Sequence, residues 1–554
     1  MSRRESSVQV APAAAMEYSD MDSLSSTATV SMHNGHGKAA TGAPAREPHM
    51  GLLTSCNMIV GLIIGSGIFA SPGPVLLKVV SVGAALCIWA LGGILSMMGA
   101  LCYAELGCMI VRSGGEYQYL KASFGRCVAL SFTWSNLVLS NAIGTASIAI
   151  VFAGYICNMA YFNAADPSAA AKNVPAYETK LVAIGCIWAV VIFNCLAQRA
   201  GSYVSNIFTG AKVLALTMII IIGFVWLGKG NVSSFQNAFE NSSTNGLHYG
   251  SAMYLALFSY NGWNNLNYGI SEVKNPEKNL PLAIIISCVS ITVAYILANI
   301  AYLAVLPVNT VATSSTVAMQ LGIAVWGTPG AYIFALMVVL STFGAVNASI
   351  WAASRVLVAA AEDGIIFPKF FAHHHQKSQA PVRALILTGI IGSLWCLPGD
   401  YTYLANIYSF IGWLWYGITI AGLVYMRFKP DMKNAHRPFK VWLPVAIVFL
   451  LVDMYLVIAP LVEAGSAGIT QYVICILIAL FSVPVWFIRV HKPAIGRKLL
   501  GWIPGYEDVD TDDSQEYSKG LDSDQETRYD GAEKASAGDH NEHKRHQSPN
   551  LQHL

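Results

Sequence analysis

The chain has 554 residues, of which 55% are apolar and 12% are charged, whereas a typical soluble domain is about 25% charged. Only 34 of the 441 residues from 50 to 490 carry a charge, and the formal net charge of the whole chain is +2. This composition excludes a soluble enzyme, disorder between residues 50 and 490, and a nucleic-acid partner.

Residues 1–49 are rich in serine, alanine and methionine, and they contain no apolar run that could form the core of a cleaved signal peptide. We expect this segment to be a disordered cytoplasmic arm. The first membrane span then serves as the targeting signal.

The segment from residue 50 to residue 490 is predicted to be the transmembrane domain of an all-α polytopic membrane protein. Roughly 20 apolar residues cross the hydrocarbon core of a bilayer as a helix, and twelve such stretches follow one another here. They begin near Leu52, Ala84, Val128, Leu181, Asn206, Tyr249, Leu282, Tyr332, Arg383, Tyr403, Trp442 and Gln471.

The first span contains a glycine cluster near its middle, Gly61-Leu-Ile-Ile-Gly-Ser-Gly-Ile-Phe69. A helix in hydrocarbon has to satisfy its own backbone, so a break at this depth is expected only where the chain lines a cavity. A close helix contact through small residues is the alternative interpretation.

Lys212 lies inside the apolar stretch of the fifth span. A lysine at the centre of a span costs roughly 2.5 to 3.5 kcal/mol on insertion scales, so we expect a partner or an internal cationic role. The alternative is that its ammonium reaches the cytoplasmic surface along the helix.

The connection after the fifth span carries two glycosylation sequons, at Asn231 and Asn241. The connections that would share this side hold only four basic residues, Lys78, Lys172, Lys180 and Lys229, and most other Lys and Arg fall on the opposite side. By the positive-inside rule, both termini are predicted to be cytoplasmic.

The sixth span contains the polar run Phe258-Ser-Tyr-Asn-Gly-Trp-Asn-Asn-Leu-Asn267, five spans after the glycine cluster. Interruptions at corresponding places in two halves are typical of a transporter site at a repeat interface. The N–H groups freed there attract a carboxylate and the freed carbonyls accept from an ammonium, so the pair suits an amino acid.

Residues 491–554 contain 13 acidic and 8 basic residues and little apolar content. We expect a disordered, acidic cytoplasmic tail. All eleven cysteines lie between residues 50 and 490 without metal-type spacing, and the sequence predicts neither a metal nor a cofactor.

Six motifs in this order resemble the L-type amino-acid transporters, which are the light chains of heteromeric amino-acid transporters in the amino acid, polyamine and organocation superfamily. The motifs are Gly61-Leu-Ile-Ile-Gly-Ser-Gly-Ile-Phe69, Tyr103-Ala-Glu-Leu106, Arg112-Ser-Gly-Gly-Glu-Tyr117, Phe258-Ser-Tyr-Asn-Gly-Trp-Asn264, Lys274-Asn-Pro-Glu-Lys-Asn-Leu-Pro281 and Ser341-Thr-Phe-Gly-Ala-Val-Asn347.

This resemblance implies twelve spans with a five-plus-five inverted repeat of the bacterial leucine transporter type, in which spans one and six are broken. It also implies sodium-independent exchange of amino acids by alternating access across the plasma membrane. Lys212 would then occupy the region where sodium-coupled relatives hold an ion. This role would explain why a lysine is kept inside the span despite the cost of inserting it.

The site residues that the resemblance implies come from spans one, six and ten. Phe258 would be the outer gate, Asn261 would line the side-chain pocket, and Trp413 would help to close it. The full substrate-binding set is Ile63, Gly65, Ser66, Gly67, Phe258, Ser259, Asn261 and Tyr408.

Many relatives have a cysteine in the outer loop between spans three and four that forms a disulfide with a single-span glycoprotein heavy chain. The corresponding loop here has none, and Cys157 precedes it at the predicted outer end of span three. A heavy chain therefore remains a candidate partner without the usual covalent link.

Asn261 is a second difference from the family pattern, after the missing loop cysteine, because different relatives have glycine, serine or aspartate at this position. A neutral amide leaves no fixed anion for a cationic side chain, which favours large neutral or aromatic L-amino acids. The alternatives are an exchanger of neutral and cationic amino acids, a polyamine or proton-coupled carrier, and, from another class, a membrane nutrient sensor.

Overall fold

The computed structural model describes residues 50–112, 114–162, 174–196, 201–362, 367–375, 380–433 and 435–491. The predicted arm, and the predicted tail apart from His491, lie outside these residues. Within them the chain is helical, and the one β-type contact is a parallel bridge between Met50 and Val273. The Met50 N–H donates to the carbonyl of Glu272 at 2.9 Å, which joins the start of the domain to the end of the sixth predicted span.

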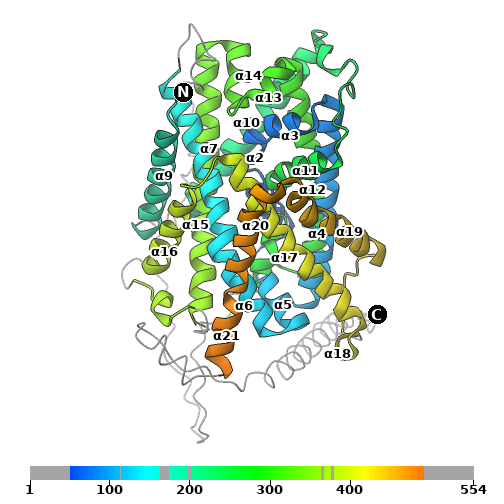
Figure 1. Ribbon diagram of the computed structural model, residues 1–554, viewed down its shortest axis with the longest axis vertical. Helices are drawn as coiled ribbons and strands as arrows, with labels where there is room; N and C mark the ends of the chain where they lie inside the picture. Colours follow the sequence, from blue (N-terminus) through cyan, green and yellow to red (C-terminus); the bar gives the residue numbers. More distant parts are fainter. Residues whose placement is uncertain are drawn as a thin grey trace, which may run out of the picture. The chain divides into compact units, whose positions relative to one another are not determined.

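The N-terminal half of the domain begins with a helix in three pieces (Figure 1). Its elements are α1 (Leu52–Ile63), α2 (Gly67–Ala70), α3 (Pro72–Val79), α4 (Val82–Met109), α5 (Glu116–Phe124), α6 (Arg126–Ser135), the π-helical segment η1 (Asn136–Asn141), α7 (Ala142–Ala160), α9 (Ala176–Leu196) and α10 (Gly201–Gly228).

The C-terminal half follows a loop that contains the short helix η3 (Ser233–Phe235). Its elements are α11 (Gly246–Tyr260), η4 (Asn265–Glu272), α12 (Pro276–Val305), α13 (Val308–Thr313), α14 (Val317–Trp326), α15 (Thr328–Glu362), η5 (Lys369–Ala372), α16 (Val382–Trp395), α17 (Tyr401–Phe428), α18 (Pro430–Lys433), α19 (Leu443–Glu463), α20 (Gly465–Leu480) and α21 (Ser482–His491).

Side-chain caps mark the start of three long helices. Ser81 accepts from the Ala84 N–H at 3.4 Å before α4, Asn245 accepts from Leu247 before α11, and Asp400 accepts from Tyr403 at 2.9 Å before α17. Each cap satisfies one N–H group that the first turn of a helix leaves unpaired.

Ten helical stretches among the described residues are long and apolar enough to cross a membrane, which makes the chain a multi-pass membrane protein. The other two predicted spans are shorter. The sixth is divided because α11 stops at Tyr260 and a turn precedes η4, and the ninth is α16, with 14 residues. A helix of 14 residues is about 21 Å long, less than the roughly 30 Å of the hydrocarbon core.

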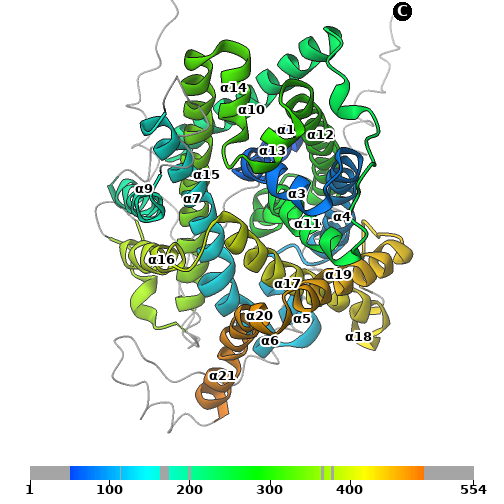
Figure 2. The same ribbon diagram turned by 45° about the horizontal axis from the view of Figure 1, so that its top comes forward.

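Helices from the two halves pack against one another in pairs. α4 contacts α12, α7 contacts α15, α9 contacts α16, and α2 and α3 contact α11. Figures 1 and 2 show α7 and α15 side by side over much of their length. The broken helices therefore lie in a frame built from both halves.

Candidate functional site

The first break separates α1 from α2. Helical hydrogen bonding in α1 ends where the Ile64 N–H donates to the carbonyl of Val60 at 3.0 Å. Among the described residues, the N–H groups of Gly65, Ser66 and Gly67 donate to no other backbone carbonyl. Free N–H groups at the start of a helix carry partial positive charge, so this turn can bind an anionic group.

Two neighbours in this turn differ in their surroundings. Gly65 is partly exposed, and a Cβ added to it would meet nothing closer than the Ile63 carbonyl oxygen at 3.8 Å. Ser66 is 1% exposed, and in the described part of the chain its hydroxyl has no hydrogen-bond partner. Gly65 thus borders open space, and Ser66 offers an unused polar group beside it.

The second break follows α11 and lies directly against the first. Gly262 has a φ of +115°, and a Cβ added to it would lie 3.2 Å from the carbonyl carbon of Leu62 and 3.3 Å from the nitrogen of Ile63. Both the backbone conformation and the close approach to α1 require glycine here. The two interruptions predicted from sequence are therefore in contact.

Tyr295 of α12 contacts both broken helices. Its hydroxyl lies 3.0 Å from the carbonyl oxygen of Ile63 and 3.0 Å from that of Ser259. Both carbonyls lie near helix ends, where intrahelical donors are missing. A side chain from a third helix thus supplies the donor that the breaks need within the membrane.

A close contact joins α2 to α11. A Cβ added to Gly67 would lie 2.4 Å from the Ser259 Oγ and 2.5 Å from its Cα. The Ser259 hydroxyl donates to the Ser71 Oγ at 3.1 Å, and the Ser71 Oγ lies 2.7 Å from the Tyr401 hydroxyl. Gly67 is therefore a packing glycine between the broken helices, whereas Gly65 borders the open space.

We expect Gly67→Ala to reduce amino-acid uptake at least about tenfold, because overpacking of a tight contact typically costs about 1 to 3 kcal/mol and here displaces α2 from α11. The measurement is initial uptake normalised to surface protein. Gly65→Ala is the matched control, since its methyl group has room, and it should retain most of the uptake. Wild-type uptake by Gly67→Ala would contradict this placement.

The predicted outer gate, Phe258, lies among aromatic side chains of α17. Its ring packs edge-to-face on Tyr401 and Tyr408, with centroids 5.5 Å and 5.2 Å away, and it is 8% exposed. Trp413 belongs to a different cluster, because its ring packs on Phe449 of α19 and on Tyr416. The structure thus brings Phe258 and Tyr408 together and does not bring Trp413 to them.

Lys212 of α10 reaches the first break. Its side chain is buried, with 4% exposure, and its ammonium donates to the carbonyl of Gly61 at 3.3 Å. A Cβ added to Gly61 would lie 3.0 Å from Thr209, one turn before Lys212. The lysine therefore points to the end of α1 and stays buried.

Asn261 begins a chain of hydrogen bonds that leaves the second break. Its amide nitrogen donates to the Tyr416 hydroxyl at 3.1 Å, and that hydroxyl donates to the Asn264 Oδ1 at 3.5 Å. The amide nitrogen of Asn264 donates to Glu116 Oε1 at 2.5 Å. Burial raises the pKa of the Glu116 carboxyl, and hydrogen bonds to it act in the opposite direction.

Several residues that complete the site were not among those predicted from the sequence. Tyr295 and Tyr416 place hydroxyls at the breaks, Tyr401 contacts Ser71 after α2, and Glu116 and Asn264 form the end of the polar chain. Glu116 and Asn264 both belong to motifs that carried the family resemblance, so a signal was present. Their pairing across 148 residues needed the fold.

The residues predicted to face outward lie apart from the breaks. Asn231 and Asn241 are both exposed in the loop between α10 and α11. Cys157 is 5% exposed and is a free cysteine within α7. Residues 163–173 of the predicted cysteine-free loop lie outside the described residues.

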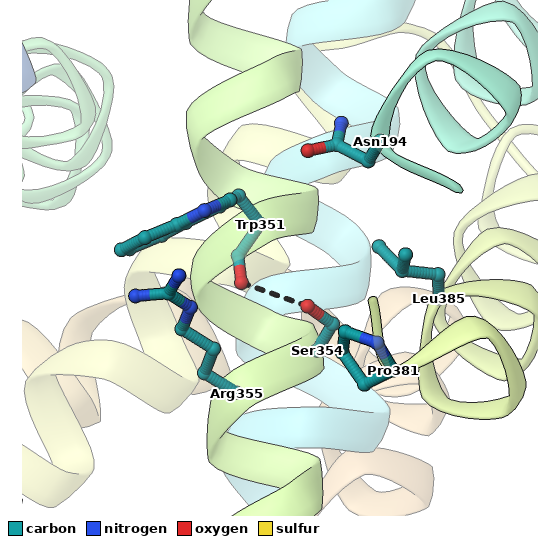
Figure 3. Close-up of a pocket in the computed structure, with 6 residues that line it drawn as sticks. All are labelled: Asn194, Trp351, Ser354, Arg355, Pro381 and Leu385. Carbon is teal, nitrogen blue, oxygen red and sulfur yellow. Dashed lines mark hydrogen bonds between the residues drawn. The ribbon is translucent and has the colours of Figure 1, made fainter. Parts of the chain in front are cut away.

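A small pocket lies where α9, α15 and α16 meet, away from the two breaks (Figure 3). The Arg355 guanidinium lies 3.4 Å from the centroid of the Trp351 ring, and Ser354 donates to the carbonyl of Trp351. The lining residues are Asn194, Trp351, Ser354, Arg355, Pro381 and Leu385. No residue of the predicted substrate site lines this pocket.

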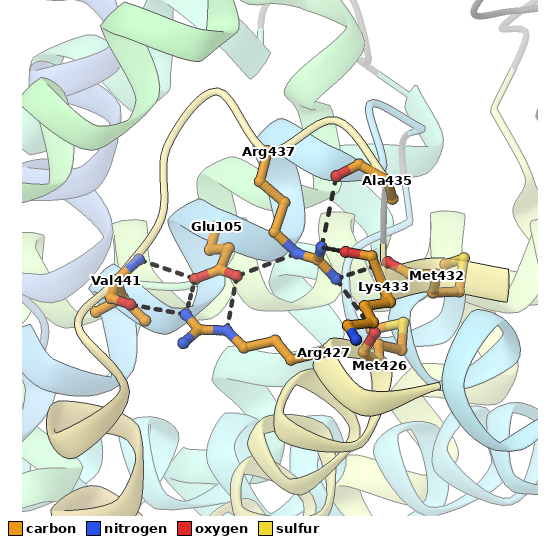
Figure 4. Close-up of polar contacts among 8 residues, drawn as sticks. All are labelled: Glu105, Met426, Arg427, Met432, Lys433, Ala435, Arg437 and Val441. Carbon is orange, nitrogen blue, oxygen red and sulfur yellow. Dashed lines mark hydrogen bonds and ion pairs between the residues drawn. The ribbon is translucent and has the colours of Figure 1, made fainter. Parts of the chain in front are cut away.

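A buried ion cluster joins the end of α4 to the end of α17 (Figure 4). The Glu105 carboxylate, with 0% exposure, accepts from both Nε and Nη2 of Arg427 and from the Val441 N–H at 2.8 Å. The Arg437 Nε lies 3.4 Å from the same carboxylate. Burial lowers the pKa of Arg437, and Glu105 raises it. Two guanidinium groups therefore share one carboxylate.

The family model described as amino acid permease matches residues 50–484, which include both breaks and Lys212. The chain belongs to the amino acid permease family. A permease moves its solute across a membrane without transforming it, so this chain is a transporter and not an enzyme.

Two transporters align with most of the sequence of this permease. It is 41% identical to the b(0,+)-type amino acid transporter 1 of Mus musculus over 80% of its own length and 88% of the relative. It is 38% identical to the Mus musculus large neutral amino acids transporter small subunit 2, over 82% of its length and 83% of the relative. The resemblance to the L-type transporters is confirmed.

Proposed function

We propose that this permease is a sodium-independent exchanger that moves large neutral or aromatic L-amino acids across the plasma membrane by alternating access. The observation that supports the proposal is the contact between the two interrupted helices, because it brings free N–H groups and partly exposed backbone together between two predicted membrane spans. The carboxylate of an amino acid needs a set of donors, and the N–H groups of the first break supply one.

The packing of the helices supports twelve spans with a five-plus-five inverted repeat. If span six repeats span one, the pairs that contact each other are spans one and six, two and seven, three and eight, and four and nine. Equivalent elements meet one another near the axis of a two-fold repeat, and transporters of this kind bind substrate there.

The substrate is proposed to bind between the breaks. Its carboxylate would accept from the N–H groups of Gly65, Ser66 and Gly67, and its side chain would lie toward Phe258 and Asn261. The neutral amide of Asn261 and the aromatic surroundings of Phe258 support large neutral side chains. The name of one relative, a large neutral amino acids transporter, supports the same class.

Lys212 is proposed to replace a diffusible cation. Its buried ammonium holds the carbonyl of Gly61, four residues before Gly65. A fixed positive charge at this place makes a bound sodium ion unnecessary. Transport should therefore proceed equally in sodium and in choline buffers.

Exchange is tested in proteoliposomes that contain the purified protein. Preloading with unlabelled leucine or phenylalanine should accelerate uptake of labelled phenylalanine, because the return step of an exchanger requires substrate. Equal uptake into empty vesicles would argue against exchange. Accumulation driven by an imposed pH gradient would favour the proton-coupled alternative, and competition by lysine or arginine would favour the mixed neutral and cationic exchanger.

A role in nutrient sensing is the hypothesis from another class. In that case, deletion of residues 500–554 should abolish signalling while amino-acid binding persists. An exchanger that lacks those residues should keep its uptake. The same deletion therefore separates the two functions.

Orientation and partners complete the proposal. Both termini are proposed to be cytoplasmic, with glycans on the exposed Asn231 and Asn241, so that Asn→Gln at both sites should remove the mobility shift caused by a glycosidase. A single-span heavy chain is proposed to bind without a disulfide, because Cys157 is buried. A complex with such a chain that separates only under reducing conditions would contradict this.

A further inference from the structure

The hydrogen-bond chain that starts at Asn261 has a fixed direction. Glu116, 1% exposed, lies at its inner end, and its Oε1 accepts from the amide nitrogen of Asn264. Asn264 must therefore turn its amide nitrogen toward Glu116 and its Oδ1 toward Tyr416. The distances of 2.5 Å and 3.5 Å correspond to these two contacts.

Tyr416 continues the same order of donors and acceptors. A phenol has one hydrogen, and because that hydrogen points to the Asn264 Oδ1, the phenol oxygen accepts from its other neighbour. That neighbour is the amide nitrogen of Asn261, at 3.1 Å. With its nitrogen held in this way, Asn261 directs its Oδ1 away from Tyr416.

The surroundings hold this chain in place. Tyr119 donates to the Asn267 Oδ1 at 3.0 Å, and the Asn267 amide nitrogen donates to the Asn264 backbone carbonyl at 3.0 Å. Asn264 and Tyr416 are 5% and 8% exposed, whereas Asn261 is partly exposed at the break. Asn261 is therefore the more exposed end of the chain.

We propose that Glu116 is a positioning residue that fixes the direction of this chain, so that Asn261 presents an acceptor oxygen to substrates whose side chains carry an N–H or O–H donor. The proposal rests on the proposed function and names a substrate preference within it. The pocket would favour glutamine or tyrosine over analogues of similar size that lack the donor. Glu116 itself does not touch the substrate.

The test compares donor and non-donor partners: glutamine with the γ-methyl ester of glutamate, and tyrosine with 4-fluorophenylalanine. Affinities are measured by ligand-induced thermal stabilisation of the purified full-length protein, and KM values by uptake. The unsubstituted protein should prefer the donor in each pair by roughly threefold to tenfold, the worth of one hydrogen bond.

Two variants remove the fixed direction of the hydrogen-bond chain while keeping side chains of similar size. In Glu116→Gln the amide can either donate or accept, and in Tyr416→Phe the chain is cut at its centre, so each should reduce the preference toward unity. Their effects should not add in the double variant, because both act on the same chain. Tyr254→Phe is the control, since it loses a buried hydroxyl that donates to the Leu456 carbonyl and lies outside the chain.

The outcomes are distinct. An unchanged preference in Glu116→Gln and Tyr416→Phe, or an equal loss in Tyr254→Phe, overturns the proposal. If Glu116→Gln does not fold, Tyr416→Phe alone decides. Binding with the expected preference but without uptake supports this inference and counts against the proposed exchange function.

Discussion

Lys212→Met should lower the rate of phenylalanine uptake by about tenfold to a hundredfold. The buried ammonium donates to the Gly61 carbonyl, and a hydrogen bond from a charged group contributes about 1.5 to 3 kcal/mol. Its loss leaves the carbonyl unpaired and releases the end of α1 beside the break. Uptake into proteoliposomes, normalised to incorporated protein, measures the effect.

The matched control for this variant is Lys229→Met, at the end of the same helix. Lys229 is exposed, and its ammonium lies 4.1 Å from the centroid of the Trp226 ring, so uptake should change by less than about twofold, as surface substitutions usually have small effects. Stimulation of the unsubstituted protein by sodium, or equal losses in both variants, would refute the role given to Lys212.

Glu105→Leu should destabilise the folded protein by about 3 to 5 kcal/mol, because it leaves the buried Arg427 and Arg437 without their shared carboxylate. The apparent Tm of the purified protein in detergent, followed by the fraction that remains monodisperse, measures the loss. The double variant Glu105→Leu with Arg427→Leu should be more stable than Glu105→Leu alone, since fewer unpaired buried charges remain.

An ion pair near the solvent provides the comparison for that cluster. Lys78 and Glu463 lie 2.8 Å apart, and the Lys78 side chain is 35% exposed. Lys78→Leu should therefore change stability by no more than about 1 kcal/mol. A Tm for Glu105→Leu as high as that for Lys78→Leu would show that the buried cluster contributes little.

The breaks were predictable from sequence because glycine and asparagine runs are rare at mid-membrane depth. Gly262 and Gly65 lie where those runs predicted an interruption. The role of Gly67 was not predictable, since its close neighbour Ser259 comes from another helix far along the chain. Composition locates a break, whereas the fold decides which glycine packs and which one faces open space.

Helical spacing explains the outcome for the aromatic residues of α17. Tyr401 and Tyr408 are seven residues apart, about two turns, so both reach Phe258 from one face. Trp413 is five residues after Tyr408, which places it about 140° around the helix, and it packs on Phe449 instead. The spacing could have separated these residues, but it could not have identified Phe449 as the neighbour.

The hydroxyl of Tyr295, shared between the two broken helices, affects how these helices could bind an ammonium group. Its phenol holds a single hydrogen, yet the oxygens of Ile63 and Ser259 lie equally far from it. At any instant one of these oxygens lacks that donor. A protonated amine, which brings three hydrogens of its own, would supply the remaining oxygen while the phenol holds the other.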